Sequence, residues 1–263
     1  MTIHNKLRII KSINLALLTA VIALGASTTT YAGILNGTGN VTPDIIFGSG
    51  NANGSFTGET RNNIEVGLRA KQRYPAANIF NYDGVDTYTF DSNVLTTNPA
   101  NRSVFNFEWS INIDQSDTDT LQLSDFSYLF SFDTDASAAV SYSTFDPFNT
   151  LGFFDHALGD NSTLNGGGTV STSNSDLLTN MNSFSIAQQS ANLGFGYSAD
   201  PDLPGAYDFK MEVFQAGSQI LLSSAEISVL VTPLAVPTTT TLPLMLGGIG
   251  LLGFMARKRK LKS

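Results

Sequence analysis

The stretch VFNFEWSINI, residues 104–113, alternates apolar and polar side chains along its length. The apolar set is Phe105, Phe107, Trp109, Ile111 and Ile113, and the polar set is Asn106, Glu108, Ser110 and Asn112. Because successive side chains of a β-strand point to opposite faces of its sheet, this period of two predicts a strand with one face buried in a core. Trp109, the single tryptophan, is expected in that core rather than on an exposed sugar-binding surface.

The same alternation surrounds this segment. Residues 121–132 continue it after the acidic turn DQSDTDT, which predicts a hairpin with residues 104–113. Further strands are expected at residues 41–47, 63–70, 85–90 and 140–144, and residues 207–213 and 220–231 read as a closing hairpin. Many short strands between Gly/Asn/Ser-rich loops predict an all-β fold, an antiparallel β-sandwich of immunoglobulin-like or jelly-roll type, as one domain over residues 33–235.

Residues 1–32 have the features of a secretory signal peptide. A basic start that contains Lys6 and Arg8 precedes an apolar segment at residues 13–26, and small residues lead up to Ala32. This order predicts export through the Sec translocon and cleavage after Ala32.

The C-terminal segment, residues 236–263, combines a VPTTTT box, an uncharged run of 15 residues at 242–256 and the basic end RKRKLKS. Spanning a hydrocarbon core of ~30 Å takes roughly 20 residues, so the run needs its flanks to form a single transmembrane helix. Four consecutive cations favour the cytoplasmic side, which places the body of the protein outside that membrane. The signal peptide predicts the same orientation.

This tail resembles the PEP-CTERM sorting signal of Gram-negative bacteria that make exopolysaccharide. The residues that carry the resemblance are Val236, Pro237, Arg257, Lys258, Arg259 and Lys260, with Thr238 where the family usually has Glu. The resemblance implies recognition and removal of the tail by a membrane protease, the exosortase. It also implies a final location at the cell surface or in the extracellular matrix. A plain membrane anchor, retained after export across the inner membrane, is the alternative.

The body resembles a group of uncharacterised PEP-CTERM proteins in the stretches TPDIIFGSGNANGSF, FEWSIN, FDHALGDNST and PGAYDFKMEVF. This resemblance implies one continuous secreted domain and carries no known activity.

Residues 33–235 hold 6 of the 14 Lys and Arg but all 22 Asp and Glu, which gives a net charge of −16 against −8 for the whole chain. Such a body is expected to repel nucleic acid and to favour cations or neutral polymers such as polysaccharide. The chain has no cysteine, so disulfides and thiol chemistry are excluded.

One locally basic stretch, GLRAKQRY, contains Arg69, Lys71 and Arg73. It could dock an acidic sugar or a partner. The favoured interpretation is a solvated strand edge that charge protects from aggregation.

His156 is the single histidine of the body, and Asp155, Asp160 and Ser162 lie close to it in sequence. These residue types could form a Ser-His-Asp triad, but no nucleophile-elbow motif accompanies them. A loop histidine that hydrogen-bonds a turn is favoured, and no catalytic residue is assigned.

Aspartates are the candidate metal ligands, since carboxylate oxygens are what Ca²⁺ prefers. Asp114, Asp117 and Asp119 form one cluster, and Asp133 and Asp135 form another. Neither completes the EF-hand loop pattern, and capping of solvated turns is the favoured role. No other cofactor is expected.

These observations predict a non-enzymatic β-sandwich protein with a structural or interaction role in the envelope or exopolysaccharide matrix. The alternative is a calcium-dependent carbohydrate-binding module. A weaker alternative is a polysaccharide-active enzyme, for which the fold alone gives no warrant.

Overall fold

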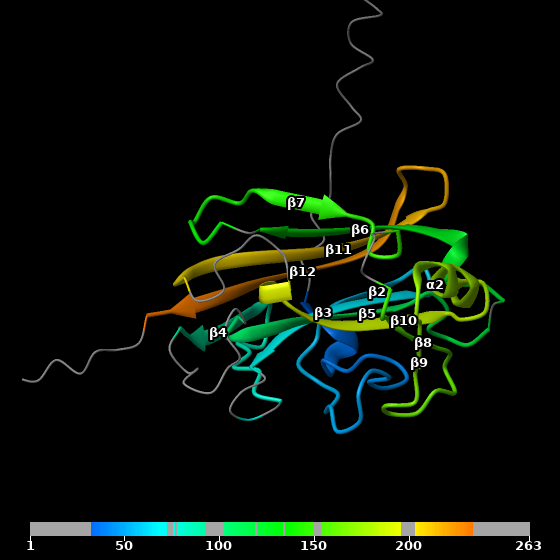
Figure 1. Cartoon of the computed structure of the whole chain (residues 1–263), viewed down its shortest axis with the longest axis horizontal. Helices are drawn as coiled ribbons and strands as arrows, with labels where there is room; N and C mark the ends of the chain where they lie inside the picture. The colour runs from blue at the N-terminus through cyan, green and yellow to red at the C-terminus, as the bar shows by residue number, and fades with distance from the viewer. Residues whose placement is uncertain are drawn as a thin grey trace, which may run out of the picture.

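The computed structural model of the chain describes residues 33–72, 76, 78–92, 103–118, 120–133, 135–149, 154–195 and 203–233. Within them, two β-sheets stack face to face (Figure 1). Sheet A runs in the order β1 (Gly33–Ile34), β2 (Thr57–Arg61), β3 (Ile64–Gln72), β5 (Phe105–Asn112), β10 (Ile186–Asn192), β8 (Ala157–Gly159) and β9 (Thr169–Val170). Sheet B runs in the order β4 (Thr87–Asp91), β12 (Leu221–Thr232), β11 (Gly205–Gln215), β6 (Phe126–Asp133) and β7 (Tyr142–Phe145). The all-β, sandwich-like architecture predicted from the alternation is therefore confirmed.

The helices in the described residues are short. The α-helix α2 spans Asn174–Met181, and the 3₁₀ turns are η1 (Leu35–Gly37), η2 (Leu123–Asp125) and η3 (Leu193–Phe195). The side chain of Ser173 caps α2 by accepting a hydrogen bond from the backbone N–H of Asp176 at 3.1 Å. None of the helices in the described residues has the length and apolar character needed to cross a membrane.

Both terminal signals lie outside the described residues. This holds for the signal peptide and its cleavage residue Ala32, and for the predicted span at residues 242–256. It holds equally for the sorting residues Val236, Pro237, Thr238, Arg257, Lys258, Arg259 and Lys260. Their roles remain predictions.

Strand β5 occupies the middle of sheet A, antiparallel to both β3 and β10. Its apolar set faces sheet B as predicted, and Trp109 belongs to the core with an exposed fraction of 3%. The ring of Phe107 stacks on Phe209 of β11, with centroids 4.9 Å apart. This aromatic contact between the sheets fixes the centre of the core.

The predicted hairpin between residues 104–113 and 121–132 is wrong. β6 lies in sheet B, where it pairs with β11 and β7, so β5 and β6 face each other across the core instead of sharing a ladder. Phe107 and Phe130 stack across that interface with centroids 5.3 Å apart. Alternation shows that a strand buries one face but does not identify its neighbour, and an arch between two sheets satisfies the same pattern as a hairpin.

The closing hairpin of β11 and β12 is confirmed, with Gly205 opposite Val231 at one end and Phe214 opposite Leu221 at the other. The predicted strands at residues 63–70, 85–90 and 140–144 correspond to β3, β4 and β7. β4, however, pairs with β12 in parallel, so sheet B is mixed rather than purely antiparallel. Parallel strands are joined by a long connection, so no local turn sequence predicts that they pair.

The predicted strand at residues 41–47 is also wrong, because this segment is a loop that covers the outer face of sheet A (blue in Figure 1). Side chains of the sheet replace the missing strand partners. Gln188 accepts a hydrogen bond from the Ile46 N–H at 2.8 Å and donates to the Asp44 carbonyl at 2.9 Å. Glu65 accepts from the Thr42 N–H at 2.7 Å, and burial raises the pKa of its carboxyl. Strands β3 and β5 in the middle of sheet A are thereby buried on their polar face as well as on their apolar one.

Candidate binding site on the covered face of sheet A

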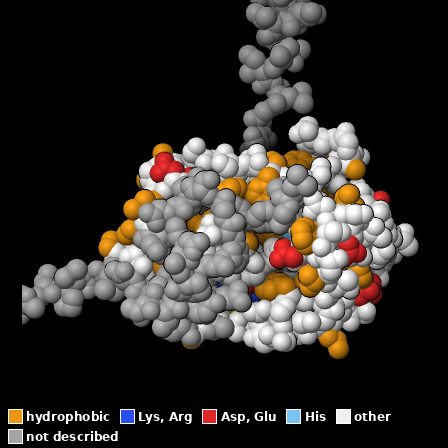
Figure 2. All heavy atoms as spheres, viewed as in Figure 1, with side chains coloured by type: hydrophobic (Ala, Val, Ile, Leu, Met, Phe, Trp, Pro, Cys, Tyr) orange, Lys and Arg blue, Asp and Glu red, His pale blue; other side chains and the backbone are white. Residues whose placement is uncertain are grey.

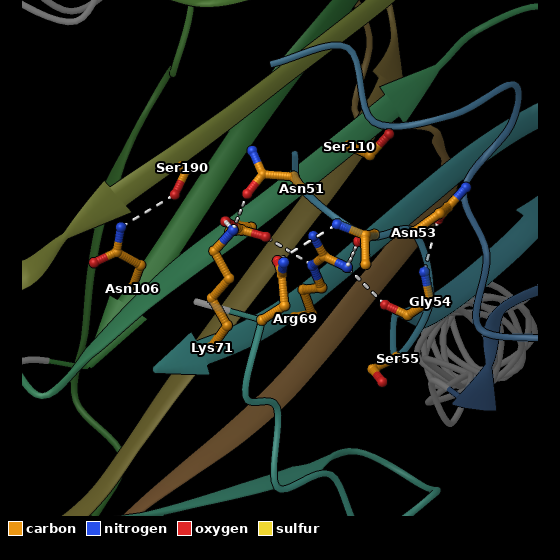
Figure 3. A network of polar contacts seen from close by, with 12 residues as sticks. Asn51, Asn53, Gly54, Ser55, Arg69, Lys71, Asn106, Ser110 and Ser190 are labelled. Carbon is orange, nitrogen blue, oxygen red and sulfur yellow. Dashed lines mark hydrogen bonds and ion pairs between the residues drawn. The ribbon is translucent and has the colours of Figure 1, made fainter. Parts of the chain in front are cut away.

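Three charged side chains from neighbouring strands meet beneath this loop (Figure 3). Arg69 of β3 lies directly opposite Glu108 of β5, and its Nε is 2.7 Å from Glu108 Oε2. Lys71 projects from the same face of β3, and its Nζ is 2.6 Å from Glu108 Oε1. The exposed fractions of the side chains are 0% for Arg69 and Glu108 and 4% for Lys71. We refer to these three residues as the charged triad. Two cations and one carboxylate give it a net charge of +1.

The covering loop and Phe80, which follows β3 in the chain, enclose Arg69. The guanidinium carbon lies 4.2 Å from the ring centroid of Phe56 and 4.6 Å from that of Phe80. Nη1 donates to the carbonyls of Ala52 at 2.9 Å and Gly54 at 2.7 Å. Aromatic faces and carbonyl oxygens both attract a cation, so Arg69 ties the loop to the sheet.

Beside the triad, the loop leaves a cavity of about 320 Å³. The residues that line it are Phe47, Gly48, Ser49, Gly50, Asn51, Lys71 and Ser190. Gly48 and Gly50 have positive φ angles of 62° and 84°, which let the loop turn above the sheet.

The walls of this cavity combine an ammonium, an amide, a hydroxyl and an aromatic ring. Lys71 Nζ donates to Asn51 Oδ1 at 2.6 Å and lies 5.6 Å from the ring centroid of Phe47. On the sheet side, Ser190 Oγ accepts a hydrogen bond from Asn106 Nδ2 at 3.1 Å. Polar groups fixed in place next to one aromatic ring suit a small, hydroxyl-rich or anionic ligand.

The prediction that the basic stretch forms a solvated strand edge is wrong for Arg69 and Lys71. β3 lies between β2 and β5, not at an edge, and both side chains are buried. The loop at residues 41–56 buries these charges, and its arrangement over the sheet is a tertiary feature that the local sequence does not show. Arg73 lies outside the described residues.

The aspartates proposed as calcium ligands are only partly brought together. Asp114, Asp117 and Asp160 line one cavity of about 220 Å³, whereas Asp119 lies outside the described residues. Asp114 Oδ1 accepts hydrogen bonds from Asn63 Nδ2 at 2.9 Å and from the Thr118 N–H at 3.2 Å. In the part of the chain that the structure describes, no group of three acidic or histidine side chains is arranged to hold a metal ion.

The second aspartate cluster caps turns, as expected from the sequence, but Asp133 is buried rather than solvated, with an exposed fraction of 1%. Asp133 accepts from the backbone N–H of Asp135 at 2.9 Å and from that of Ser141 at 3.0 Å. These contacts use both of its carboxylate oxygens.

His156 is buried in the core, with its ring centroid 5.1 Å from that of Trp109 and 5.3 Å from that of Phe148. Its Nε2 lies 2.7 Å from the carbonyl oxygen of Pro147, which confirms the predicted hydrogen bond to a turn. Burial lowers the pKa of the ring, so it is neutral at physiological pH.

The other residues considered for a Ser-His-Asp triad have different partners. Ser162 Oγ donates to Asp160 Oδ1 at 2.6 Å, and Asp155 Oδ1 accepts from Gln189 Nε2 at 2.8 Å. The described contacts of these residues therefore do not assemble a Ser-His-Asp relay.

Sequence reasoning did not find Gln188 and Ser190, because β10 was not predicted as a strand. Its sequence IAQQSAN has one large apolar residue, Ile186, whereas β5 has four. The available signal was a polar side chain at every second position: Gln188, Ser190 and Asn192.

Comparisons with protein-family models, curated proteins and solved structures give no match to this chain.

Proposed function

We propose that the protein is a non-enzymatic, exported β-sandwich, of immunoglobulin-like or jelly-roll type, with a structural or interaction role in the cell envelope or exopolysaccharide matrix. One observation carries the interaction role, namely the cavity of about 320 Å³ beside the charged triad. Its ammonium, amide, hydroxyl and aromatic groups match the chemistry of a sugar residue better than that of a lipid or nucleic acid. The net charge of −16 in the body supports the same preference.

The destination rests on the two terminal segments. Residues 1–32 support export through the Sec translocon, and residues 236–263 support processing by an exosortase-type protease. Intact mass spectrometry of the mature protein from its native host tests both cuts. A mass that begins at Gly33 and ends near residues 236–241 supports processing, and a mass that includes Lys262 indicates a retained anchor.

The interaction role is tested by co-sedimentation of the protein with the exopolysaccharide of its host. Ser190→Phe would fill the cavity from the sheet side and is expected to weaken binding. Thr89→Phe is the matched control, since Thr89 pairs with the exposed residue Leu230 on the outer face of sheet B. Equal binding by wild type and Ser190→Phe would place the contact elsewhere. Release of reducing ends from the polysaccharide would overturn the non-enzymatic assignment.

A calcium-dependent carbohydrate-binding module is the second candidate. The observation that favours it is that Asp114, Asp117 and Asp160 from two separate loops line one cavity, although their carboxylates would have to move together to hold an ion. A ligand present at a hundred times its dissociation constant stabilises a protein by about 2.7 kcal/mol. Thermal unfolding in millimolar calcium and in chelator tests this directly. Identical melting curves would remove calcium from the proposal.

A further inference from the structure

Lys71 contacts both a carboxamide and a carboxylate under the covering loop. Its Nζ donates to Asn51 Oδ1 at 2.6 Å, and Figure 3 shows the two side chains pointing toward each other. The same Nζ lies 2.6 Å from Glu108 Oε1. Since a carbonyl bond is about 1.2 Å long, the amine nitrogen lies at most about 3.8 Å from Cγ of Asn51. This separation is close to the ~3–3.5 Å from which a nucleophile attacks a carbonyl carbon.

The carboxamide of Asn51 is held in one orientation. Its Nδ2 donates to the carbonyl of Phe47 at 2.8 Å and to that of Gly48 at 3.0 Å. These two bonds turn Oδ1 toward the lysine and fix the plane of the amide. The amine and the carbonyl carbon therefore stay next to each other, which replaces an encounter in solution by a standing contact.

The charged triad holds one buried positive charge in excess, because Arg69 and Lys71 share the carboxylate of Glu108. The surface has the opposite character, since the view in Figure 2 shows carboxylates at several places and very little Lys or Arg. A buried charge without a counter-charge is costly. A reaction that turned the ammonium of Lys71 into an amide would remove this charge and leave Arg69 and Glu108 as a matched pair.

We propose that Lys71 and Asn51 join through an isopeptide bond, with Glu108 as the base. Transfer of one proton from Nζ to Glu108 Oε1 across the 2.6 Å contact gives the amine the lone pair with which it attacks Cγ of Asn51. The bond from Nζ to Cγ forms and the bond from Cγ to Nδ2 breaks. Nδ2 leaves as an ammonium ion, with one proton directly from the amine and the one that Glu108 had taken up. The ion carries away the excess positive charge, and no further reactant is needed.

Glu108 is placed to serve both nitrogens. In the tetrahedral intermediate they are bonded to the same carbon, so a carboxyl group in contact with one lies next to the other. The cavity of about 320 Å³, which Lys71 and Asn51 both line, gives the released ion space to leave.

The bond ties the covering loop covalently to β3. The chain has no cysteine, so this link does for the loop what a disulfide does in other exported proteins. The amide that forms still offers an N–H and a carbonyl oxygen in the wall of the cavity. The inference therefore neither rests on the proposed sugar site nor removes it.

Peptide mapping of the full chain, unfolded before digestion with trypsin, tests the bond. Trypsin does not cut after a lysine whose amine is acylated, so the peptide that contains Asn51 is expected to carry residues 70–73 as a branch. Its mass is expected to be about 17 Da below the sum of the two peptides, the mass of one ammonia. Lys210 pairs with Glu212 at 2.8 Å and is the internal control, which trypsin is expected to cut. Complete cutting at Lys71, with Asn51 in an unbranched peptide of full mass, would overturn the proposal.

Two variants remove the reacting groups. Lys71→Arg keeps the positive charge without an amine that attacks, and Asn51→Ala removes the carboxamide, so both are expected to give unbranched peptides only. Asn106→Ala is the matched control and is expected to keep the branch, because Asn106 lies opposite Lys71 on β5 but its amide donates to Ser190.

A loss of ammonia alone is not sufficient evidence for the bond. Asparagines that precede glycine can lose the same mass by cyclisation, and the chain has such pairs at residues 36–37, 53–54 and 165–166. A loss of about 17 Da that occurs equally in wild type and in Lys71→Arg, with no branched peptide in either, would contradict the proposal.

The role of Glu108 is tested separately. Glu108→Gln has no base and is expected to stay unbranched, whereas Glu108→Asp keeps a carboxylate and is expected to form the bond more slowly. Circular dichroism checks that each variant is folded before it is digested. A branched peptide in Glu108→Gln would show that Glu108 is not the base, and the wild-type digest decides on the bond itself whether or not these variants fold.

Discussion

The Nε of Arg69 lies 2.7 Å from Oε2 of Glu108, and neither side chain is exposed to solvent. Lys71 shares the same carboxylate, so one anion neutralises two cations under the covering loop. Burying an ion pair costs desolvation that the attraction between the charges only partly offsets. The structure therefore depends on keeping all partners in place.

Glu108→Gln is expected to destabilise the fold by about 3–5 kcal/mol, because it keeps the volume but leaves two buried cations without a counter-charge. Urea unfolding measures the loss. Glu212→Gln is the matched control, since Glu212 pairs with Lys210 at 2.8 Å on a partly exposed face, with exposed fractions of 14% and 30%. Its cost is expected to stay below about 1 kcal/mol. Equal costs for the two variants would contradict the dependence on Glu108.

The core between the sheets makes a second prediction. Phe107 stacks on both Phe130 and Phe209 and is 1% exposed. Phe107→Ala is expected to lower the free energy of unfolding by about 3–5 kcal/mol, through lost burial and the cavity left behind. Leu164→Ala is the control because Leu164 is 79% exposed. A small effect at Phe107 would mean that the sheets do not pack through this ring.

The approach of β2 to β3 makes a third prediction. A Cβ atom on Gly58 would lie 1.9 Å from the carbonyl oxygen of Val66, a backbone atom that cannot move independently of β3. Gly58→Ala is expected to lower the free energy of unfolding by about 1–3 kcal/mol, because the added methyl group forces the strands apart. Gly33→Ala on β1 meets nothing within 4 Å and serves as the control. Thermal unfolding of both variants measures the difference. Similar melting temperatures would contradict the close approach of β2 to β3.

The sequence predicted which segments form strands better than it predicted which strands pair with each other. Alternation is a local property, so β5, β11 and β12 could be located from it and Trp109 could be assigned to the core. Pairing depends on which strands meet after the chain has crossed between sheets. No local signal distinguishes an arch to β6 from a hairpin, and the parallel partner of β4 is distant in sequence.

The candidate site was harder to predict because its polar side chains resemble those of a solvated face. Glu108 alternates with aromatic residues, and this pattern ordinarily indicates exposure of the charged side. Its burial depends on a loop whose Ile45 and Ile46 resemble a strand in sequence. The hydrogen bonds that Gln188, Glu65 and Asn112 make to that loop show why the polar face is covered.

His156 makes a prediction about pH. Burial is the main cause that lowers the pKa of its ring below the ordinary value of 6.5, and the opposing effects of the Pro147 carbonyl and the Asp155 carboxylate are smaller. The unfolded chain therefore binds a proton at a higher pH than the folded protein does. Between those two pKa values the unfolded state holds more protons, so the free energy of unfolding falls as the pH falls below about 6.5.

Comparison of wild type with His156→Phe isolates this contribution, because the carboxylates that titrate over the same range are common to both proteins. Phenylalanine keeps a ring between Trp109 and Phe148 but has no proton to bind. Urea unfolding at intervals from pH 8 to pH 5 is expected to show wild type losing stability faster than the variant as pH falls, with the difference between them constant above about pH 7.5. His156 is the one histidine in residues 33–235, so no other imidazole can produce such a difference. Parallel pH profiles for the two proteins would mean that His156 has the same proton affinity in the folded and unfolded chains, which would contradict its burial against Trp109.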